Sequence, residues 1–141
     1  LITVNALTAS NSVIIPIQCE FYALEGLTQL MNTIRLIKYH LNPDIDVEGV
    51  VMTMKDKRYN LTNQVSNEII KFFNKKVYVT TIPRNIRLAE APSHGLPIVL
   101  YAPASKGAEA YLSLAEEFLN RNKIKYKSIT KHTKIKLREV K

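Results

Sequence analysis

The chain has 141 residues and a mass of 16.1 kDa, and its 46% hydrophobic and 23% charged residues are typical of one globular domain. No apolar run reaches the roughly 18 residues that span a bilayer, and the first ten residues lack the charged and apolar regions of a signal peptide. We therefore expect a cytoplasmic protein without a transmembrane segment. The single cysteine, Cys19, excludes an internal disulfide and makes a structural zinc site, which usually has about four Cys or His ligands, unexpected.

The net charge of +8 is concentrated near the C-terminus. Residues 1–122 hold 12 Lys or Arg and 11 Asp or Glu, a difference of +1, whereas residues 123–141 hold 8 and 1, a difference of +7. Such a basic segment attracts polyanions, either nucleic acid or an anionic membrane surface, although a solvated tail without a ligand has the same composition. We expect a folded domain over 1–122 and a basic, flexible tail over 123–141.

The first part of the chain alternates strand and helix patterns. Residues 12–17 (SVIIPI) form an apolar run typical of a buried strand, and the apolar positions between Leu27 and Leu41 recur at the spacing of one helix face. A second buried strand is predicted over 47–54. Asn60 is a suitable N-cap for the helix that follows it.

The second part continues the alternation with shorter elements. We predict a third strand over 77–82, a helical turn over 85–91 that Pro92 ends, an extended piece over 97–101 and a helix after Ser105. Strands that are apolar throughout suggest a sheet covered on both faces, and helical connections allow parallel pairing. The expected fold class is α/β, with a mostly parallel sheet flanked by helices.

Ligands of such sheets gather at the carboxyl ends of the strands. Basic residues follow two of the predicted strands at this edge: Lys55, Lys57 and Arg58 after the second strand, and Arg84 and Arg87 after the third. Five cations along one rim predict a phosphate-binding edge, whereas the same residues also suit a surface that only keeps the protein soluble.

No catalytic or metal-binding set is predicted. The four glycines form neither GxxxxGK[ST] nor GxGxxG, so these 141 residues contain no backbone cradle for nucleotide phosphates. Cys19 would need His40 or His94 beside it to act as a nucleophile, and a buried, inert cysteine is the favoured interpretation. Glu116 and Glu117 are neighbours on one predicted helix and face different directions.

Four stretches resemble the ParA/Soj family of DNA-partitioning ATPases. They are residues 4–30 (VNALTASNSVIIPIQCEFYALEGLTQL), 42–54 (NPDIDVEGVVMTM), 77–98 (VYVTTIPRNIRLAEAPSHGLPI) and 105–118 (SKGAEAYLSLAEEF). The resemblance covers about residues 1–120 and implies a P-loop NTPase-like fold related to that of MinD. In the family, the Walker A lysine and both switch motifs precede the segment that Leu1 resembles. We therefore expect the C-terminal half of such an ATPase, without the phosphate and Mg²⁺ sites and inactive alone.

The resemblance assigns roles to the basic rim. Met54, Pro83 and Arg84 match positions around the adenine of ATP, and Arg58 and Arg87 match arginines that bind DNA without sequence preference. Lys57 adds a cation where many relatives have a small residue. The alternative for Arg84 and Arg87 is a structural ion pair with Glu90.

The resemblance also implies partners and a location. Family members bind ATP with Mg²⁺, dimerise in the ATP state, coat double-stranded DNA of the nucleoid and respond to a ParB-type centromere-binding protein. Chromosome or plasmid partition is therefore the expected function. Two alternatives remain: a non-enzymatic DNA-binding remnant, and a MinD-like membrane ATPase. The irregular apolar positions after Lys123 argue against the amphipathic helix that the MinD-like ATPase would need.

Overall fold

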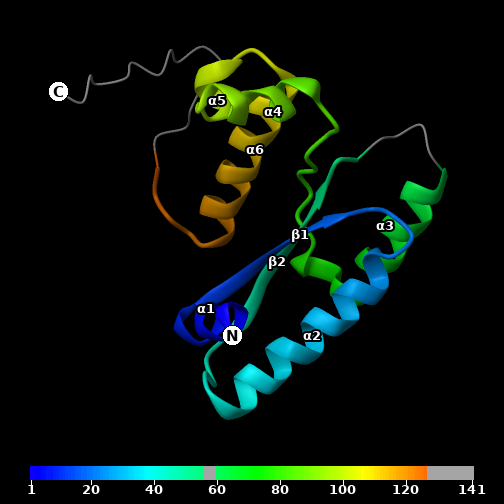
Figure 1. The fold of residues 1–141 in the computed structure, drawn as a ribbon, viewed down its shortest axis with the longest axis vertical. Coiled ribbons are helices and arrows are strands. Elements are labelled where there is room, and N and C mark those ends of the chain that lie inside the picture. The colour runs from blue at the N-terminus through cyan, green and yellow to red at the C-terminus, as the bar shows by residue number, and fades with distance from the viewer. Residues whose placement is uncertain (56–59, 127–141) are drawn as a thin grey trace. The chain divides into compact units, whose positions relative to one another are not determined.

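The computed structural model describes residues 1–55 and 60–126, and its contacts divide the chain into two compact units (Figure 1). Unit 1 is Leu1–Thr81 and unit 2 is Ile82–Lys141. Among the described residues, no helix is both long enough and apolar enough to cross a membrane. The predicted flexible tail, apart from its first four residues, lies outside the described part of the chain.

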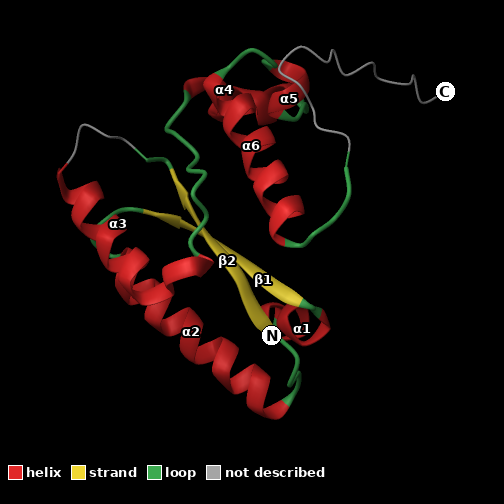
Figure 2. Cartoon of the chain, turned by 180° about the vertical axis from the view of Figure 1, so that it is seen from behind, coloured by secondary structure: helices red, strands yellow, loops and turns green. Residues whose placement is uncertain are grey.

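Unit 1 confirms the α/β prediction. Strands β1 (Ser12–Gln18) and β2 (Asp46–Thr53) pair in parallel, and the helix α2 (Ala23–His40) connects them (Figure 2). Helix α3 (Asn60–Phe73) and the short 3-10 turn η1 (Asn74–Lys76) follow β2. A parallel pair needs a long crossover connection, and α2 supplies it. The strands predicted over 12–17 and 47–54, and the helix predicted after each of them, therefore form at the expected positions.

One apolar core lies between the strands and the two long helices. It joins residues of β1 and β2 to the buried stripes of α2 and α3, among them Ile15, Val50, Ile34 and Ile69. Both helices contribute to this one core, so they lie on the same face of the strand pair. Apolar residues that recur every three or four positions fall on one face of a helix. This is why the sequence pattern predicted both helices.

The strands differ in how they are covered. In β2, Val50 and Val51 point to opposite faces and both are buried, as expected for a sheet covered on both sides. In β1 the pattern alternates: Ile15 and Ile17 are buried, whereas Ile14 is 44% exposed. The prediction of burial on both faces is therefore wrong for β1, since the described residues leave its second face partly open. A register shift between Val13 and Ile14 also bends the ladder at this point.

One predicted strand is absent, and one helix forms that the sequence did not predict. Residues 77–82 do not form a strand: the segment contributes an isolated parallel bridge between Val77 and Val50 and a hydrogen bond from Tyr78 N to the Val50 carbonyl (2.9 Å). Val79 is 88% exposed, so a longer strand would bury nothing there. The first helix, α1 (Ile2–Ala9), was not predicted.

Helix α1 depends on a residue far along the chain. The Asn42 amide nitrogen donates to the carbonyls of Leu7, Thr8 and Ser10 at 3.1, 3.1 and 2.8 Å. Carbonyls at the C-terminal end of a helix lack their usual partners four residues on. Ser10 N donates to the Leu7 carbonyl at 3.4 Å, and Asn42 supplies a further donor to all three carbonyls. Leu7 is the one residue of α1 that is buried.

Unit 2 is helical in its described part. It contains α4 (Ile86–Glu90), the 3-10 turn η2 (Ala91–His94), α5 (Ile98–Tyr101) and α6 (Lys106–Arg121). The helical turn predicted over 85–91 is confirmed, and so is the helix after Ser105, whose hydroxyl accepts a hydrogen bond from Ala108 N at 3.1 Å. The extended piece predicted over 97–101 is wrong: α5 forms there, and Ile98 packs with Ala91 and Ala108.

Candidate nucleic-acid interface

The first group of predicted site residues lies at the end of β2. Met54 directly follows the strand, has a left-handed backbone (φ 50°) and leaves its side chain 49% exposed. A left-handed conformation costs a non-glycine residue roughly 1–2 kcal/mol, and such strain is common at ligand sites. The predicted DNA-binding residues Lys57 and Arg58 lie outside the described residues.

Pro83 and Arg84 stand at the beginning of unit 2. Pro83 is half-buried and Arg84 is exposed. A thioether, a proline ring and a guanidinium plane are surfaces on which a flat purine can stack. Met54 belongs to unit 1 and the other two residues to unit 2, so a purine pocket formed by the three stays a prediction.

Arg87 is positioned by local structure. Asn85 caps α4, and its side-chain oxygen accepts a hydrogen bond from Arg87 N at 2.9 Å. The next residue, Leu88, packs against α6 where Gly107 leaves room: a Cβ on Gly107 would lie 2.6 Å from Leu88 Cγ. Because α4 is capped at one end and packed along its side, the base of the Arg87 side chain is fixed.

The Arg87 guanidinium pairs with a carboxylate on its own helix. Its Nη1 donates to Glu90 Oε2 at 3.0 Å, and the Tyr101 hydroxyl of α5 donates to the same oxygen, also at 3.0 Å. The Glu90 carboxylate, with Tyr101, raises the pKa of Arg87 above its ordinary value, so Arg87 stays a cation. The expected alternative, an ion pair with Glu90, is thus confirmed for Arg87. The pair is solvent-accessible: the two side chains are 56% and 37% exposed.

Tyr101 is the part of this cluster that the sequence did not reveal. The segment containing it was predicted to be extended, which would separate it from α4. Helix α5 instead brings its hydroxyl to Glu90, and the His94 ring stacks on the Tyr101 ring at a centroid distance of 4.7 Å. No local pattern marks this contact, because it joins residues eleven positions apart through the packing of unit 2.

Cys19 behaves as the favoured interpretation expected. It is buried, and the Ser66 hydroxyl donates to its sulfur at 3.3 Å. Neither histidine that could have served as its base contacts it: the His40 ring lies against Tyr39, and the His94 ring lies against Tyr101. Within the described residues, moreover, no three His, Cys, Asp or Glu side chains gather as a metal site would require.

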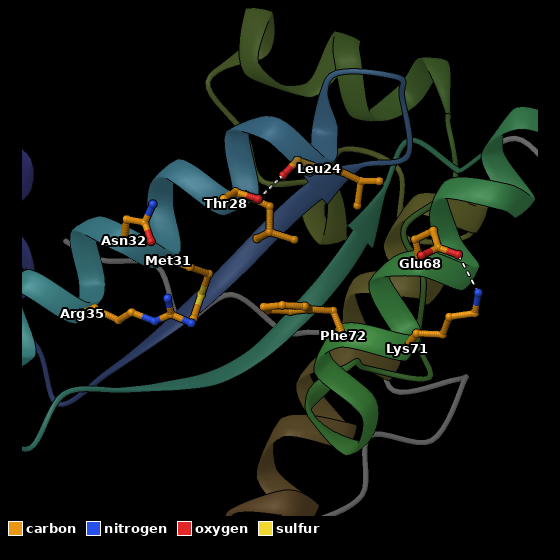
Figure 3. A pocket seen from close by; sticks show the side chains of 9 residues that line it. Leu24, Thr28, Met31, Asn32, Arg35, Glu68, Lys71 and Phe72 are labelled. Carbon is orange, nitrogen blue, oxygen red and sulfur yellow. Dashed lines mark hydrogen bonds and ion pairs between the residues drawn. The ribbon is translucent and has the colours of Figure 1, made fainter.

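A groove lies between α2 and α3 in unit 1 (Figure 3). Its volume is about 460 Å³. Apolar side chains form much of its wall, with Arg35 on one side and the ion pair of Glu68 and Lys71 (2.6 Å) on the other. The lining residues are Leu24, Leu27, Thr28, Met31, Asn32, Arg35, Glu68, Lys71 and Phe72. Of the predicted site residues that the structure describes, Met54, Pro83, Arg84 and Arg87, none lines this groove.

Known proteins match this chain over most of its length. A family model described as "AAA domain" matches residues 1–47. "Sporulation initiation inhibitor protein Soj" of Bacillus subtilis is 64% identical over 117 residues, which are 83% of this chain and 46% of that protein. "Chromosome partitioning protein ParA" of Myxococcus xanthus is 52% identical over 122 residues, 86% of this chain and 43% of the relative. The chain therefore spans just under half the length of these relatives.

A solved structure supports the fold. Cobyrinic acid a,c-diamide synthase from Mycobacterium smegmatis, with bound ADP and magnesium, superposes with a TM-score of 0.66 at 30% identity, covering 86% of this chain and 42% of that one. A third relative, 47% identical over 120 residues, is the "Chromosome-partitioning ATPase Soj" of Thermus thermophilus; the match covers 85% of this chain and 48% of that protein. The superposition supports the fold, and the sequence identities to the partitioning proteins lead to the conclusion that this chain belongs to the ParA/Soj family.

Proposed function

We propose that these residues are part of a DNA-partitioning ATPase of the ParA/Soj type, in which they supply the adenine side of the nucleotide site and a cationic contact to DNA. The observation that carries the DNA-binding part is Arg87: its backbone is fixed by the Asn85 cap and its guanidinium is half exposed. Cations placed this way bind phosphates without reading bases. The relatives named as partitioning proteins support the general function.

The nucleotide part of the proposal uses Met54, Pro83 and Arg84 for the base. Bound ATP with Mg²⁺ would supply the phosphoryl group to be hydrolysed, and residues that contact its phosphates must come from outside these 141, which lack GxxxxGK[ST]. The chain alone is therefore expected to be inactive as an ATPase. A homodimer in the ATP state, a ParB-type partner and a place on the nucleoid belong to the same proposal.

The test of DNA contact is a salt titration of binding to a fluorescent DNA duplex. Each phosphate contact contributes roughly 0.9 to the slope of log K against log salt. Arg87→Ala should therefore lower the slope by about one and weaken binding equally for unrelated sequences. The matched control is Arg35→Ala, because Arg35 is also exposed and, among the described residues, forms no hydrogen bond or ion pair. Equal effects of the two substitutions would show that only net charge matters.

A second candidate, the non-enzymatic DNA-binding remnant, is favoured by the charge of +7 over residues 123–141. Binding to DNA with a steep salt slope and without ATP, by the 141-residue chain alone, would support it. The ATPase is supported instead if DNA binding and ATP hydrolysis both appear only when a polypeptide carrying the Walker A segment of a relative is added. ATP-dependent binding to anionic vesicles rather than to DNA would favour the MinD-like alternative.

A further inference from the structure

The Arg87 side chain is held by a carboxylate at the position where DNA binding would require a phosphate. Glu90 lies one helical turn after Arg87 on α4, and its Oε2 accepts hydrogen bonds from both Arg87 Nη1 and the Tyr101 hydroxyl. One carboxylate oxygen therefore joins two side chains from α4 and α5. The second donor comes from another helix, so Glu90 is restrained more than an ordinary surface carboxylate.

A carboxylate and a phosphate compete for the same guanidinium. Both are anions that take charge-assisted hydrogen bonds from the Arg fork, and bidentate binding of phosphate uses two parallel N–H groups. With Nη1 directed to Glu90, phosphate binding must either share the guanidinium or displace the carboxylate. The Glu90 charge also repels an approaching phosphate.

We propose that Glu90, held in place by Tyr101, is a positioning residue that limits the affinity of Arg87 for DNA phosphate. The proposal rests on the proposed DNA-binding function and adds to it an internal competitor. Glu90 orients the guanidinium in the absence of DNA and lowers its affinity in the presence of DNA. A partition protein that must leave the DNA again is served by a weak contact of this kind.

The test compares two substitutions that remove the same charge. Glu90→Gln keeps the side-chain shape, releases Arg87 and should raise the affinity for a fluorescent DNA duplex by about two- to five-fold at low salt, the range expected for one exposed ion pair. Glu68→Gln is the matched control, because Glu68 also pairs with a cation three residues away, Lys71, at 2.6 Å and with both side chains exposed. It should change the affinity by less than about 1.5-fold, since Lys71 is not placed at the proposed interface.

The Tyr101→Phe variant tests whether Tyr101 holds Glu90 in place. It removes one hydrogen bond to Glu90 without changing any charge, so a small gain in affinity, below that of Glu90→Gln, is expected. The double variant Arg87→Ala with Glu90→Gln should bind no better than Arg87→Ala alone, because the gain requires the guanidinium. Circular dichroism of each variant confirms that unit 2 remains folded.

The outcomes separate this inference from the proposed function. If Arg87→Ala leaves DNA binding unchanged, the DNA-binding role of Arg87 is wrong. If Arg87→Ala weakens binding but Glu90→Gln and Glu68→Gln have equal effects, Arg87 binds DNA and the competition by Glu90 is refuted. A gain from Glu90→Gln that persists in the double variant would also refute it, because the gain would then come from net charge.

Discussion

Gly49 lies in the middle of β2 at a position where no side chain fits. A Cβ on Gly49 would lie 2.8 Å from the Lys76 carbonyl oxygen and 2.9 Å from Tyr78 Cδ2. Tyr78 is buried at 2% exposure, and its N–H donates to the Val50 carbonyl at 2.9 Å. Gly49→Ala therefore meets a backbone atom and a buried ring, neither of which can move without disturbing the chain that follows η1.

The size of the effect follows from two opposing contributions. Replacing glycine by alanine restricts the unfolded chain and by itself stabilises a protein by about 0.4–1 kcal/mol. Forcing extra atoms into a packed core costs about 1–3 kcal/mol, and the upper part of this range applies when backbone must shift. We expect Gly49→Ala to lower the free energy of unfolding by about 1–2 kcal/mol.

Urea unfolding followed by far-ultraviolet circular dichroism measures this difference. Gly26→Ala is the matched control: Gly26 lies in α2, and a Cβ there would meet no other part of the described chain within 4 Å, so alanine should stabilise the chain by about 0.5–1 kcal/mol. The two variants are expected to shift the urea midpoint in opposite directions. A Gly49→Ala chain at least as stable as the parent would show that Tyr78 and the Lys76 carbonyl do not hold their positions against β2.

Three further predictions concern other contacts of unit 1. Asn42→Ala should destabilise the chain by about 1–2 kcal/mol, seen as a lower urea midpoint, because three main-chain carbonyls each lose a hydrogen bond; an unchanged midpoint would contradict this. The hydrogen bond from Lys76 lowers the pKa of Asp46 in the folded chain. The pair therefore stabilises the fold fully at pH values above the pKa of Asp46 in the unfolded chain, and this stabilisation is lost as the pH falls through the lower pKa of the folded chain. The destabilisation by Asp46→Asn, at most about 0.5 kcal/mol for so exposed a carboxylate, should vanish in acid. Cys19 should react with a thiol reagent much more slowly in the folded chain than in urea, and equal rates would show that its burial is wrong.

The elements that the sequence predicted are those with a local apolar period. The stripe on α2 and the apolar runs of β1 and β2 can be read from neighbouring residues, because burial on one face requires that spacing. The caps are local as well: Ser105 begins α6 and accepts from a main-chain N–H three residues later. Local chemistry is sufficient for such elements, since both partners of each decisive contact lie within a few residues.

The elements that the sequence missed depend on distant residues. Helix α1 has its C-terminal carbonyls satisfied by Asn42, which lies 32 to 35 positions away. Helix α5 forms where Pro97 suggested an extended piece, because Ile98 packs into the small core of unit 2 with Ala91 and Ala108. Residues 77–82 have the composition of a strand, but they contribute an isolated bridge at Val77 rather than a strand of the sheet.

For the candidate site, the order of amino acids was sufficient to specify which residues carry the chemistry: a cluster of cations after two predicted strands, an arginine at 87 and a carboxylate one turn later that could pair with it. How these groups are used depends on the folded chain. Folding placed the hydroxyl of Tyr101 on the carboxylate of Glu90 and fixed α4 against α6 at Gly107. Charge and residue type are properties of single positions, whereas competition for one guanidinium depends on distances between helices, which only packing sets.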